Sequence, residues 1–218
     1  MTSAIEDYAK AIYALERRGS EPVTTNALAD RLGVTAGSAS GMLKRLGELG
    51  LAEHRPYHGV SLTEEGRRLA LEVMRHHRLL ELYLVESLGV PWDRVHAEAE
   101  VLEHVLSEEL EELIATKLGD PTHDPHGDPI PTRELHIEER TTRSLQSLSA
   151  GDRGVFTRIS DSDPEMLRFL AQRGIAPGDE LEVIDKHPFD GPLFIRFGGD
   201  VHVLGGELAR AMRVEVHE

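Results

Sequence analysis

The chain has 218 residues, of which 39% are hydrophobic and none is cysteine, so it can form two or three domains but no disulfide, thiolate metal site or cysteine nucleophile. No apolar run approaches the ~18 residues of a membrane span and no basic-then-apolar leader occurs, so we expect a cytoplasmic protein without a membrane partner. The formal net charge of −15 argues against a nucleic-acid partner, because such binders usually carry a basic surface.

Three short helices and a hairpin are predicted in the first part of the chain. Apolar residues at helical spacing predict helices over residues 4–17 and 24–33, and the second ends at a glycine. Thr35 caps a third helix that runs to about Leu49. Its apolar face consists of Ala39, Met42, Leu43, Leu46 and Leu49. Short extended pieces around a proline and a glycine predict a hairpin over residues 51–62.

Two longer helices are predicted in the middle of the chain. One begins at Thr63 and runs to about Ser87, and the next begins at Pro91 and Trp92. The second helix carries a continuous apolar stripe made of Val95, Ala99, Leu102, Leu106, Leu110 and Leu113. Four prolines and two glycines over residues 119–131 then predict a connector.

The last third of the chain is typical of a small β-barrel. After a polar linker over residues 141–150, five short alternating segments follow, interrupted by one helix around residues 164–173. The predicted fold is therefore mainly α-helical with a small β part. Its predicted domains are residues 1–70, 71–140 and 151–218, with the linker before the last one.

The first elements occur in the order of a winged helix-turn-helix, in which the third helix enters the DNA major groove. The exposed side of that helix is rich in small and hydroxyl side chains, which can approach bases and phosphates closely, while its basic residues can reach the backbone. The predicted DNA-contacting residues are Thr35, Gly37, Ser38, Ser40, Lys44 and Arg45 on the helix and Arg55 and His58 in the wing. The alternative is that these elements only pack together as a structural module.

The acidic charge lies mainly in the middle of the chain. Residues 1–70 hold nine basic and nine acidic residues, residues 71–140 hold six and 17, and residues 141–218 hold nine and 13. Seven of the 12 histidines also lie in the middle segment. A solvated helix face explains most runs of charge, and composition alone favours it. Acid enriched together with imidazole also suits a cation site, because these are the ligands left when thiolate is absent.

The spacing of six of these residues favours the cation site. Four follow one another at i, i+4, i+7 and i+8, and two stand four apart on the preceding helix. They are His96, Glu100, Glu103 and His104, and His77 with Glu81. Residues four apart share a helix face, and neighbouring glutamates repel each other unless a divalent cation lies between them. A carboxylate-rich site without sulfur suits six-coordinate Mn²⁺ or Fe²⁺, whereas zinc usually takes four nitrogen or sulfur ligands.

Four segments spread along the chain point to a known family. They are EDYAKAIYALE, MRHHRLLE, VHAEAEVLEHVLS and the GDPIP turn. In order and spacing these segments resemble the diphtheria toxin repressor family of metal-dependent repressors. The resemblance implies a winged helix-turn-helix head, a helical dimerisation and metal-binding domain, and a C-terminal SH3-like barrel. It also implies that metal binding switches on operator binding by a homodimer, without catalysis.

The resemblance further implies two metal sites. The principal site would comprise Asp7, Glu100, Glu103 and His104. The second would comprise His77, Glu81 and His96, completed from the barrel by Asp161, Asp163 or Glu165. The iron-responsive branch has Met and Cys at positions 7 and 100, so Asp7 and Glu100 resemble the manganese-responsive branch. Lys10 stands where that branch has a glutamate for a second adjacent ion, which favours two separated sites.

We therefore expect a homodimeric repressor of metal-homeostasis genes that binds double-stranded operator DNA. Mn²⁺ is the favoured activator, Fe²⁺ is the second choice, and other divalent metals would act in vitro. One alternative is a metal-dependent hydrolase or metal-storage protein. However, the sequence has no helical HExxH motif and no serine or cysteine nucleophile within a recognisable catalytic motif. Another is a regulator with the same head that senses an organic ligand.

Overall fold

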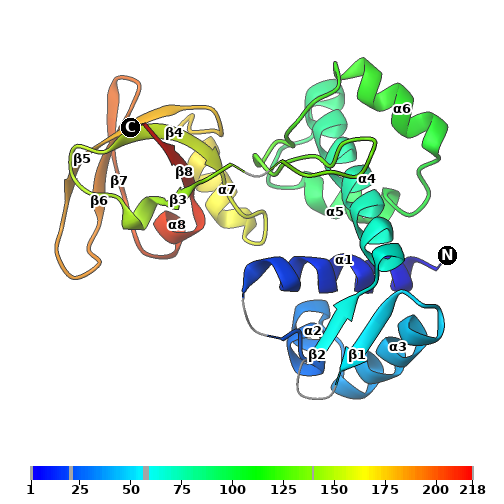
Figure 1. Cartoon of the computed structure of the whole chain (residues 1–218). Coiled ribbons are helices and arrows are strands. Elements are labelled where there is room, and N and C mark those ends of the chain that lie inside the picture. Colours follow the sequence, from blue (N-terminus) through cyan, green and yellow to red (C-terminus); the bar gives the residue numbers. More distant parts are fainter. Residues whose placement is uncertain (1, 20–21, 56–58, 139, 218) are drawn as a thin grey trace. The chain divides into compact units, whose positions relative to one another are not determined.

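The computed structural model describes residues 2–19, 22–55, 59–138 and 140–217. The chain divides into two compact units. The first consists of Met1–His77, Leu102–Glu111 and Pro131–His136, and the second of Arg78–Val101, Glu112–Ile130 and Ile137–Glu218. Figure 1 shows the elements in chain order. Within the described ranges, no helix is both long enough and apolar enough to span a membrane.

Three helices and a hairpin open the first unit, as predicted. The helices are α1 (Ser3–Arg18), α2 (Thr25–Leu32) and α3 (Ala36–Glu48). The Thr24 hydroxyl accepts a hydrogen bond from the Ala27 N–H, and the Thr35 hydroxyl accepts one from the Ser38 N–H. These bonds satisfy N–H groups that have no partner within the helix. Gly33 ends α2 in the left-handed conformation, which favours glycine.

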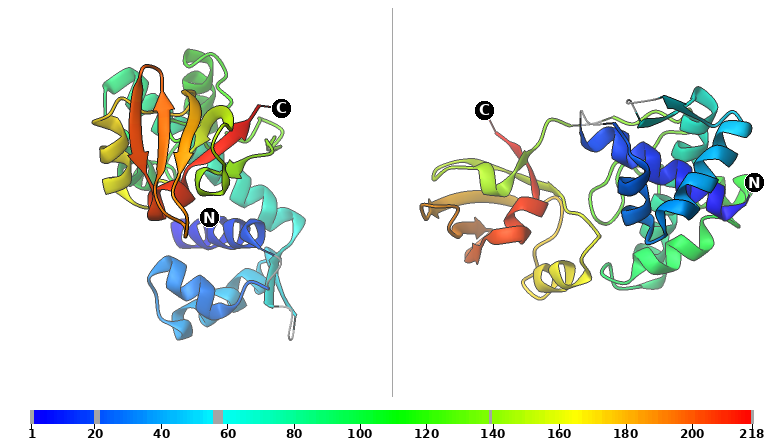
Figure 2. Two further views of the ribbon diagram at one scale, coloured as in Figure 1. Left: turned by 90° about the vertical axis from the view of Figure 1, so that its left-hand side faces the viewer. Right: turned by 90° about the horizontal axis from the view of Figure 1, so that it is seen from below.

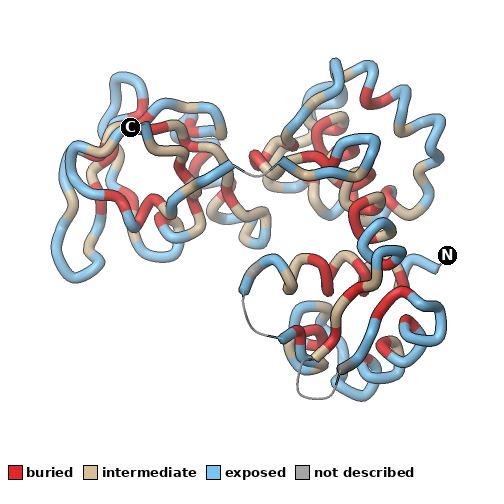
Figure 3. The backbone as a smooth tube through the Cα atoms, in the orientation of Figure 1, coloured by how far each residue is buried: buried red, intermediate tan, exposed pale blue. Residues whose placement is uncertain are grey.

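The hairpin consists of β1 (Ala52–Arg55) and β2 (Gly59–Leu62), which pair antiparallel. The predicted wing residue His58 lies outside the described residues. Helix α1 packs against α2 and α3, and buried positions occur on all three helices (Figure 3). The buried core of this part includes Ala9, Ile12, Leu28, Ala39, Leu46 and Val60. Leu49 was predicted on the apolar face, but it caps the end of α3 and is 42% exposed.

The middle of the chain differs from the prediction in one respect. Helix α4 (Glu64–Leu88) forms as expected, but the single helix predicted after Pro91 is wrong. Two helices form instead, α5 (Val95–Leu102) and α6 (Glu108–Lys117), joined by a turn. The break occurs because Ser107 caps α6 by accepting from the Leu110 N–H, and three glutamates occupy its first turn.

The C-terminal part is a six-stranded antiparallel sheet with strand order β3-β8-β4-β5-β6-β7 (Figures 1 and 2). The strands are β3 (Arg143–Ser144), β4 (Arg153–Arg158), β5 (Glu180–Lys186), β6 (Leu193–Phe197), β7 (Asp200–Leu204) and β8 (Arg213–Val216). The predicted helix forms as α7 (Pro164–Ala171), and a second short helix, α8 (Gly206–Ala211), precedes β8. Fully buried members of its core include Phe156, Ile159, Val183, Leu193, Ile195 and Met212.

The predicted linker does not extend over residues 143–148. Residues 143 and 144 form β3, and a 3-10 turn (Leu145–Ser147) follows. The turn places Leu145 and Leu148 in the barrel core, where neither is exposed. Burial of these two apolar side chains explains why a segment with a polar composition is ordered.

Candidate metal centres and DNA-binding helix

Three predicted ligands come together in the first unit. Helix α1 supplies Asp7, and the turn after α5 supplies Glu103 and His104. The His104 Nε2 atom lies 2.9 Å from Asp7 Oδ1 and 3.6 Å from Glu103 Oε1. One ligand atom from each residue lies within 4.8 Å of the others. Residues almost 100 positions apart in the sequence therefore form one cluster.

This cluster suits a six-coordinate divalent ion. Ligands on opposite sides of an ion with bonds of about 2.1 Å lie about 4.2 Å apart, so ligand atoms within 4.8 Å of one another can gather around one ion with small adjustments. Two carboxylates and an imidazole without sulfur form a donor set suited to Mn²⁺ or Fe²⁺. The three side chains therefore fit the predicted metal.

Glu6 contacts the predicted ligand His104, and the sequence did not predict this role. His104 Nδ1 lies 2.6 Å from Glu6 Oε2, and a carboxylate can only accept, so Nδ1 donates this hydrogen bond. Nε2 is the ring atom that faces Asp7 and Glu103 and would bind an ion there, and a hydrogen bond at the other ring nitrogen commonly orients metal-binding histidines. In the sequence, Glu6 looks like any acidic residue in the first turn of a helix.

Glu103 is held by two donors in the buried interior. Lys10 Nζ lies 2.6 Å from its Oε1, and His77 Nδ1 lies 2.5 Å from its Oε2. Although burial raises the pKa of Glu103, the hydrogen bond from His77 and the charge of Lys10 lower it more, so the pKa lies below its ordinary value. The carboxylate is therefore ionised and can act as a ligand.

A second cluster lies in the second unit. His96 Nδ1 lies 3.2 Å from Glu81 Oε1 and 2.9 Å from Asp161 Oδ2. The hydrogen bonds that His96 donates to Asp161 and to Glu81 raise the pKa of His96 to about 10. Glu100, predicted for the principal site, lies on α5 with its Oε1 atom 3.7 Å from His96 Nε2. Glu81 is 1% exposed, so the cluster reaches into the protein interior.

Asp124 and His126, from the connector, extend this second cluster and were not predicted. They group with Glu81, and all three side chains are buried. His126 Nε2 lies 2.8 Å from the Trp92 carbonyl oxygen and the two rings stack. Its Nδ1 atom is buried, lies 3.6 Å from Glu81 Oε2 and has no hydrogen-bond partner among the described residues. An unsatisfied buried nitrogen facing a carboxylate suits a bound cation.

The connector is fixed against the barrel at this point. The Ile159 N–H donates to the His126 carbonyl oxygen. Gly127 has φ +85°, and a Cβ atom there would lie 1.8 Å from the Thr157 carbonyl oxygen, so only glycine fits. Asp-x-His in a turn rich in proline and glycine was the available signal in the sequence, but its partner Glu81 lies far away along the chain.

Two predicted barrel ligands lie outside these clusters in the described part of the chain. Asp163 caps α7 by accepting from the Glu165 N–H, and the Glu165 side chain is 88% exposed with Arg168 at 3.9 Å. Asp161 is the member of the predicted trio that contacts His96. A helix cap and a ligand use the same residue types, which is why sequence alone did not separate them.

The predicted DNA-contacting face of α3 is exposed. Its exposed residues include Thr35, Gly37, Ser38, Ser40, Lys44 and Arg45. The Thr35 and Ser38 hydroxyls are 3.0 Å apart, so they also stabilise the start of the helix. A Cβ atom at Gly41 would meet no other atom within 4 Å. Arg55 belongs to β1.

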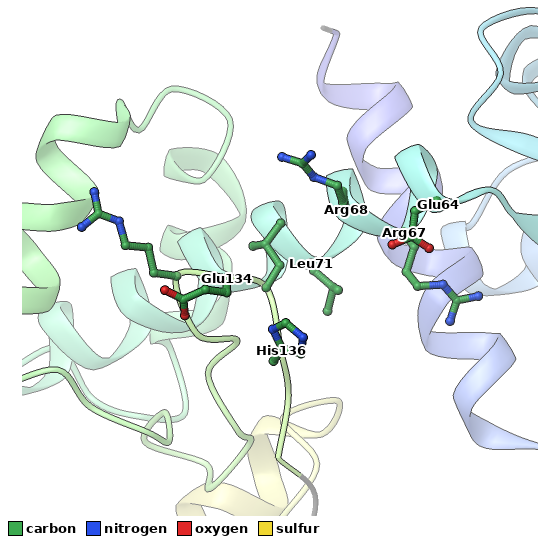
Figure 4. Close-up of a pocket in the computed structure, with 8 residues that line it drawn as sticks. Glu64, Arg67, Arg68, Leu71, Glu134 and His136 are labelled. Carbon is green, nitrogen blue, oxygen red and sulfur yellow. The ribbon is translucent and has the colours of Figure 1, made fainter.

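A cavity of about 440 Å³ lies in the first unit, between the start of α4 and the 131–136 segment (Figure 4). It is lined by Glu64, Arg67, Arg68, Leu71, Arg133, Glu134, Leu135 and His136. This lining mixes arginines with glutamates and shares no residue with the two clusters. The cavity is therefore separate from the candidate metal centres.

Three family models match the chain. The model of the iron dependent repressor N-terminal DNA binding domain matches residues 1–60. The model of the iron dependent repressor metal binding and dimerisation domain matches residues 63–132, and that of the FeoA domain matches residues 143–216.

Relatives match over nearly the full length. The iron-dependent repressor IdeR of Mycobacterium tuberculosis is 33% identical over 227 residues, covering 99% of this chain and 98% of the relative. The diphtheria toxin repressor of Corynebacterium diphtheriae is 30% identical, with 99% and 98% covered. A solved manganese-dependent transcriptional repressor in complex with manganese is 42% identical with a TM-score of 0.88, covering 96% of this chain and 98% of that one. The manganese regulator SloR is 32% identical with a TM-score of 0.77, with 99% of each chain covered. The chain therefore belongs to the diphtheria toxin repressor family of metal-dependent transcriptional repressors.

Proposed function

We propose that the chain is a Mn²⁺-activated repressor that binds operator DNA as a homodimer and controls metal-homeostasis genes, with Fe²⁺ as the second candidate metal. The observation that carries this proposal is the cluster of Asp7, Glu103 and His104 in the first unit. Its donors are oxygen and imidazole nitrogen without sulfur, which favours Mn²⁺ over softer metals. Manganese-dependent repressors among the similar structures support the same choice.

The principal site would couple metal to DNA binding through α1. Asp7 lies on α1, which packs against α2 and the proposed recognition helix α3. Asp7, Glu103 and His104 would hold the ion, whose positive charge offsets the repulsion between the carboxylates. Because the ion needs all its ligands together, it favours conformations in which α1 is fixed, and this is a population shift.

A second ion would bind in the second unit. Glu81, His96 and Asp161 would hold it together with Asp124 and His126. Glu81 belongs to both groups of donors, so one ion can use ligands from each. The buried Nδ1 atom of His126 is the observation that favours including the connector.

Dimerisation has support from exposed apolar side chains. In the first unit, Leu102, Val105 and Leu110 are 37%, 77% and 49% exposed. Neighbouring apolar side chains that remain in water suggest a face that another protein covers. In a dimer, two copies of α3 would read half-sites about one DNA turn apart, ~34 Å.

Calorimetric titration of the metal-stripped protein with Mn²⁺ tests this function. We expect saturable binding at two sites per chain. A protein that binds no divalent metal but binds DNA would favour the organic-ligand sensor, and metal-dependent hydrolysis of ester or phosphate substrates without DNA binding would favour the enzyme.

Replacement of Lys10 by methionine is expected to tighten Mn²⁺ binding at the principal site by about 10-fold. The Lys10 ammonium lies 2.6 Å from Glu103 Oε1 and therefore competes with a cation for that oxygen. Methionine keeps the apolar stem without the charge. Calorimetry measures the change, and unchanged or weaker affinity would show that Lys10 does not compete with the ion.

Replacement of Gly41 by alanine is expected to stabilise α3 by about 0.5–1 kcal/mol and to weaken operator binding about 10-fold. No intramolecular contact requires glycine at this position, so we attribute it to close approach of DNA. Gly47→Ala in the same helix is the matched control, because a Cβ there makes an ordinary contact of 3.7 Å. Thermal melts and fluorescence anisotropy separate the two effects. Equal operator affinity for both variants would remove Gly41 from the interface.

A further inference from the structure

A buried ionic cluster lies beside the principal site without belonging to it. It consists of Arg75 and His76 on α4 and Glu111 on α6. Their side chains are 12%, 10% and 13% exposed. Ionised groups lose hydration on burial, so such a cluster persists only with well-paired hydrogen bonds.

His76 connects this cluster to the backbone of a proposed metal ligand. Its Nε2 atom lies 2.9 Å from Glu111 Oε2, and its Nδ1 atom lies 3.2 Å from the main-chain carbonyl oxygen of Glu103. Both partners can only accept hydrogen bonds, so both ring nitrogens donate and the imidazole is positively charged. One end of the ring is therefore fixed on α6 and the other end holds the turn after α5.

Arg75 fixes the far end of this connection. Its Nε atom donates to Glu111 Oε1, and its Nη1 atom donates to the Pro131 carbonyl oxygen at 2.7 Å. The Glu111 N–H donates to the Ser107 carbonyl oxygen, which fixes the Glu111 backbone in the first turn of α6, while Arg75 and His76 hold its carboxylate. Glu111 consequently has little freedom to move. It therefore fixes the His76 ring, which donates to the Glu103 carbonyl oxygen.

We propose that His76 is a positioning residue that fixes the α5–α6 turn, so that Glu103 and His104 face Asp7 before metal binds. This inference rests on the proposed function, because it concerns the affinity of the same site. The side chain of Glu103 already contacts Lys10 and His77, while the bond from His76 holds its backbone. Fixing the backbone reduces the conformational entropy that ligands lose when they gather around an ion.

Two amide substitutions separate positioning from simple packing. His76→Asn keeps an N–H donor near the position of Nδ1, toward the Glu103 carbonyl, whereas His76→Gln keeps one near Nε2, toward Glu111. We expect His76→Gln to weaken Mn²⁺ binding by ~10-fold or more, as for other residues that orient metal ligands, and His76→Asn to remain within about threefold of wild type. At saturating Mn²⁺ both variants should bind operator with wild-type affinity.

Hydrogen exchange of the metal-free protein supplies a readout that does not depend on the ion. In His76→Gln we expect faster exchange of the Val105 amide, which donates to the Leu102 carbonyl oxygen within the turn. Glu111→Gln should show the same faster exchange at Val105, because it weakens the hydrogen bond that fixes the His76 ring on α6. Glu109→Gln is the matched control, since it removes the same charge from an exposed position of α6.

The outcomes distinguish this inference from the proposed function. Wild-type protein that binds Mn²⁺, with His76→Asn and His76→Gln equally weak or both unchanged, would overturn the positioning role alone. Wild-type protein that binds no Mn²⁺ would overturn both. Melting curves of the two amide variants identify any loss of folding, and exchange at Val105 in the folded fraction still decides between them.

Discussion

Operator binding by the Glu103→Gln variant is expected to lose its dependence on Mn²⁺, with affinity at least about 100-fold below that of the metal-loaded wild type. Glutamine keeps the shape of the side chain but removes the charge that attracts the ion. It also leaves Lys10 and His77 without the carboxylate that now accepts from both. Fluorescence anisotropy with a duplex selected by the wild type, with Mn²⁺ and with a chelator, measures the change.

Two controls show whether this loss reflects the ion. Glu109→Gln removes the same charge from an exposed position and should leave metal dependence unchanged. Glu103→Gln should also unfold at a lower temperature, because removing one partner of a buried charge pair costs about 3–5 kcal/mol. Binding is therefore measured well below its melting temperature. Metal-dependent binding by folded Glu103→Gln at wild-type Mn²⁺ concentrations would remove Glu103 from the site.

The His126→Ala variant is expected to bind one Mn²⁺ ion per chain where the wild type binds two. His126 offers a buried Nδ1 atom that faces Glu81, and alanine deletes this donor while leaving the principal site in the first unit intact. Calorimetry and metal analysis after gel filtration give the stoichiometry. His123→Ala is the matched control, because His123 lies in the same connector and bonds with Thr122 instead. Two ions bound to His126→Ala at wild-type affinity would exclude the connector from the second site.

Local signals in the sequence predicted the ends of most helices correctly. Thr24, Thr35 and Gly33 act through groups within a few residues, so their capping roles can be recognised without tertiary information. The prediction of one long helix after Pro91 was wrong because it relied on apolar spacing over a long segment and not on local capping groups. The apolar spacing continues from Val95 to Leu113, but Leu102, Leu110 and Leu113 are exposed, Leu113 at 62%. The apolar spacing indicates which side chains tend to be buried. It does not show whether the helix is continuous, because a turn can interrupt the helix while the spacing of the apolar residues stays the same.

The principal site could be predicted only in part. Glu103 and His104 were identifiable by their spacing, and Asp7 by its position in the family resemblance. Glu6 and Lys10 were not, because their roles depend on how α1 meets the turn after α5. An acidic residue in a first turn and a lysine one helical turn later are ordinary features of any helix.

The same limit applies to the second cluster. Asp124 and His126 gain their significance from Glu81, which lies more than 40 residues earlier on α4. Asp163 and Glu165 had equally suitable chemistry but serve a helix cap and the protein surface. The spacing of histidines and glutamates predicted a cation site, whereas the fold determines which carboxylates are close enough to share an ion.

The proposal that metal switches on DNA binding is tested most directly by selecting duplexes from a randomised pool with the wild-type protein. One selection contains Mn²⁺ and the other a chelator in its place. We expect a sequence with two related half-sites to be enriched with Mn²⁺ and no enrichment with the chelator. Equal enrichment under both conditions, or none with Mn²⁺, would contradict it.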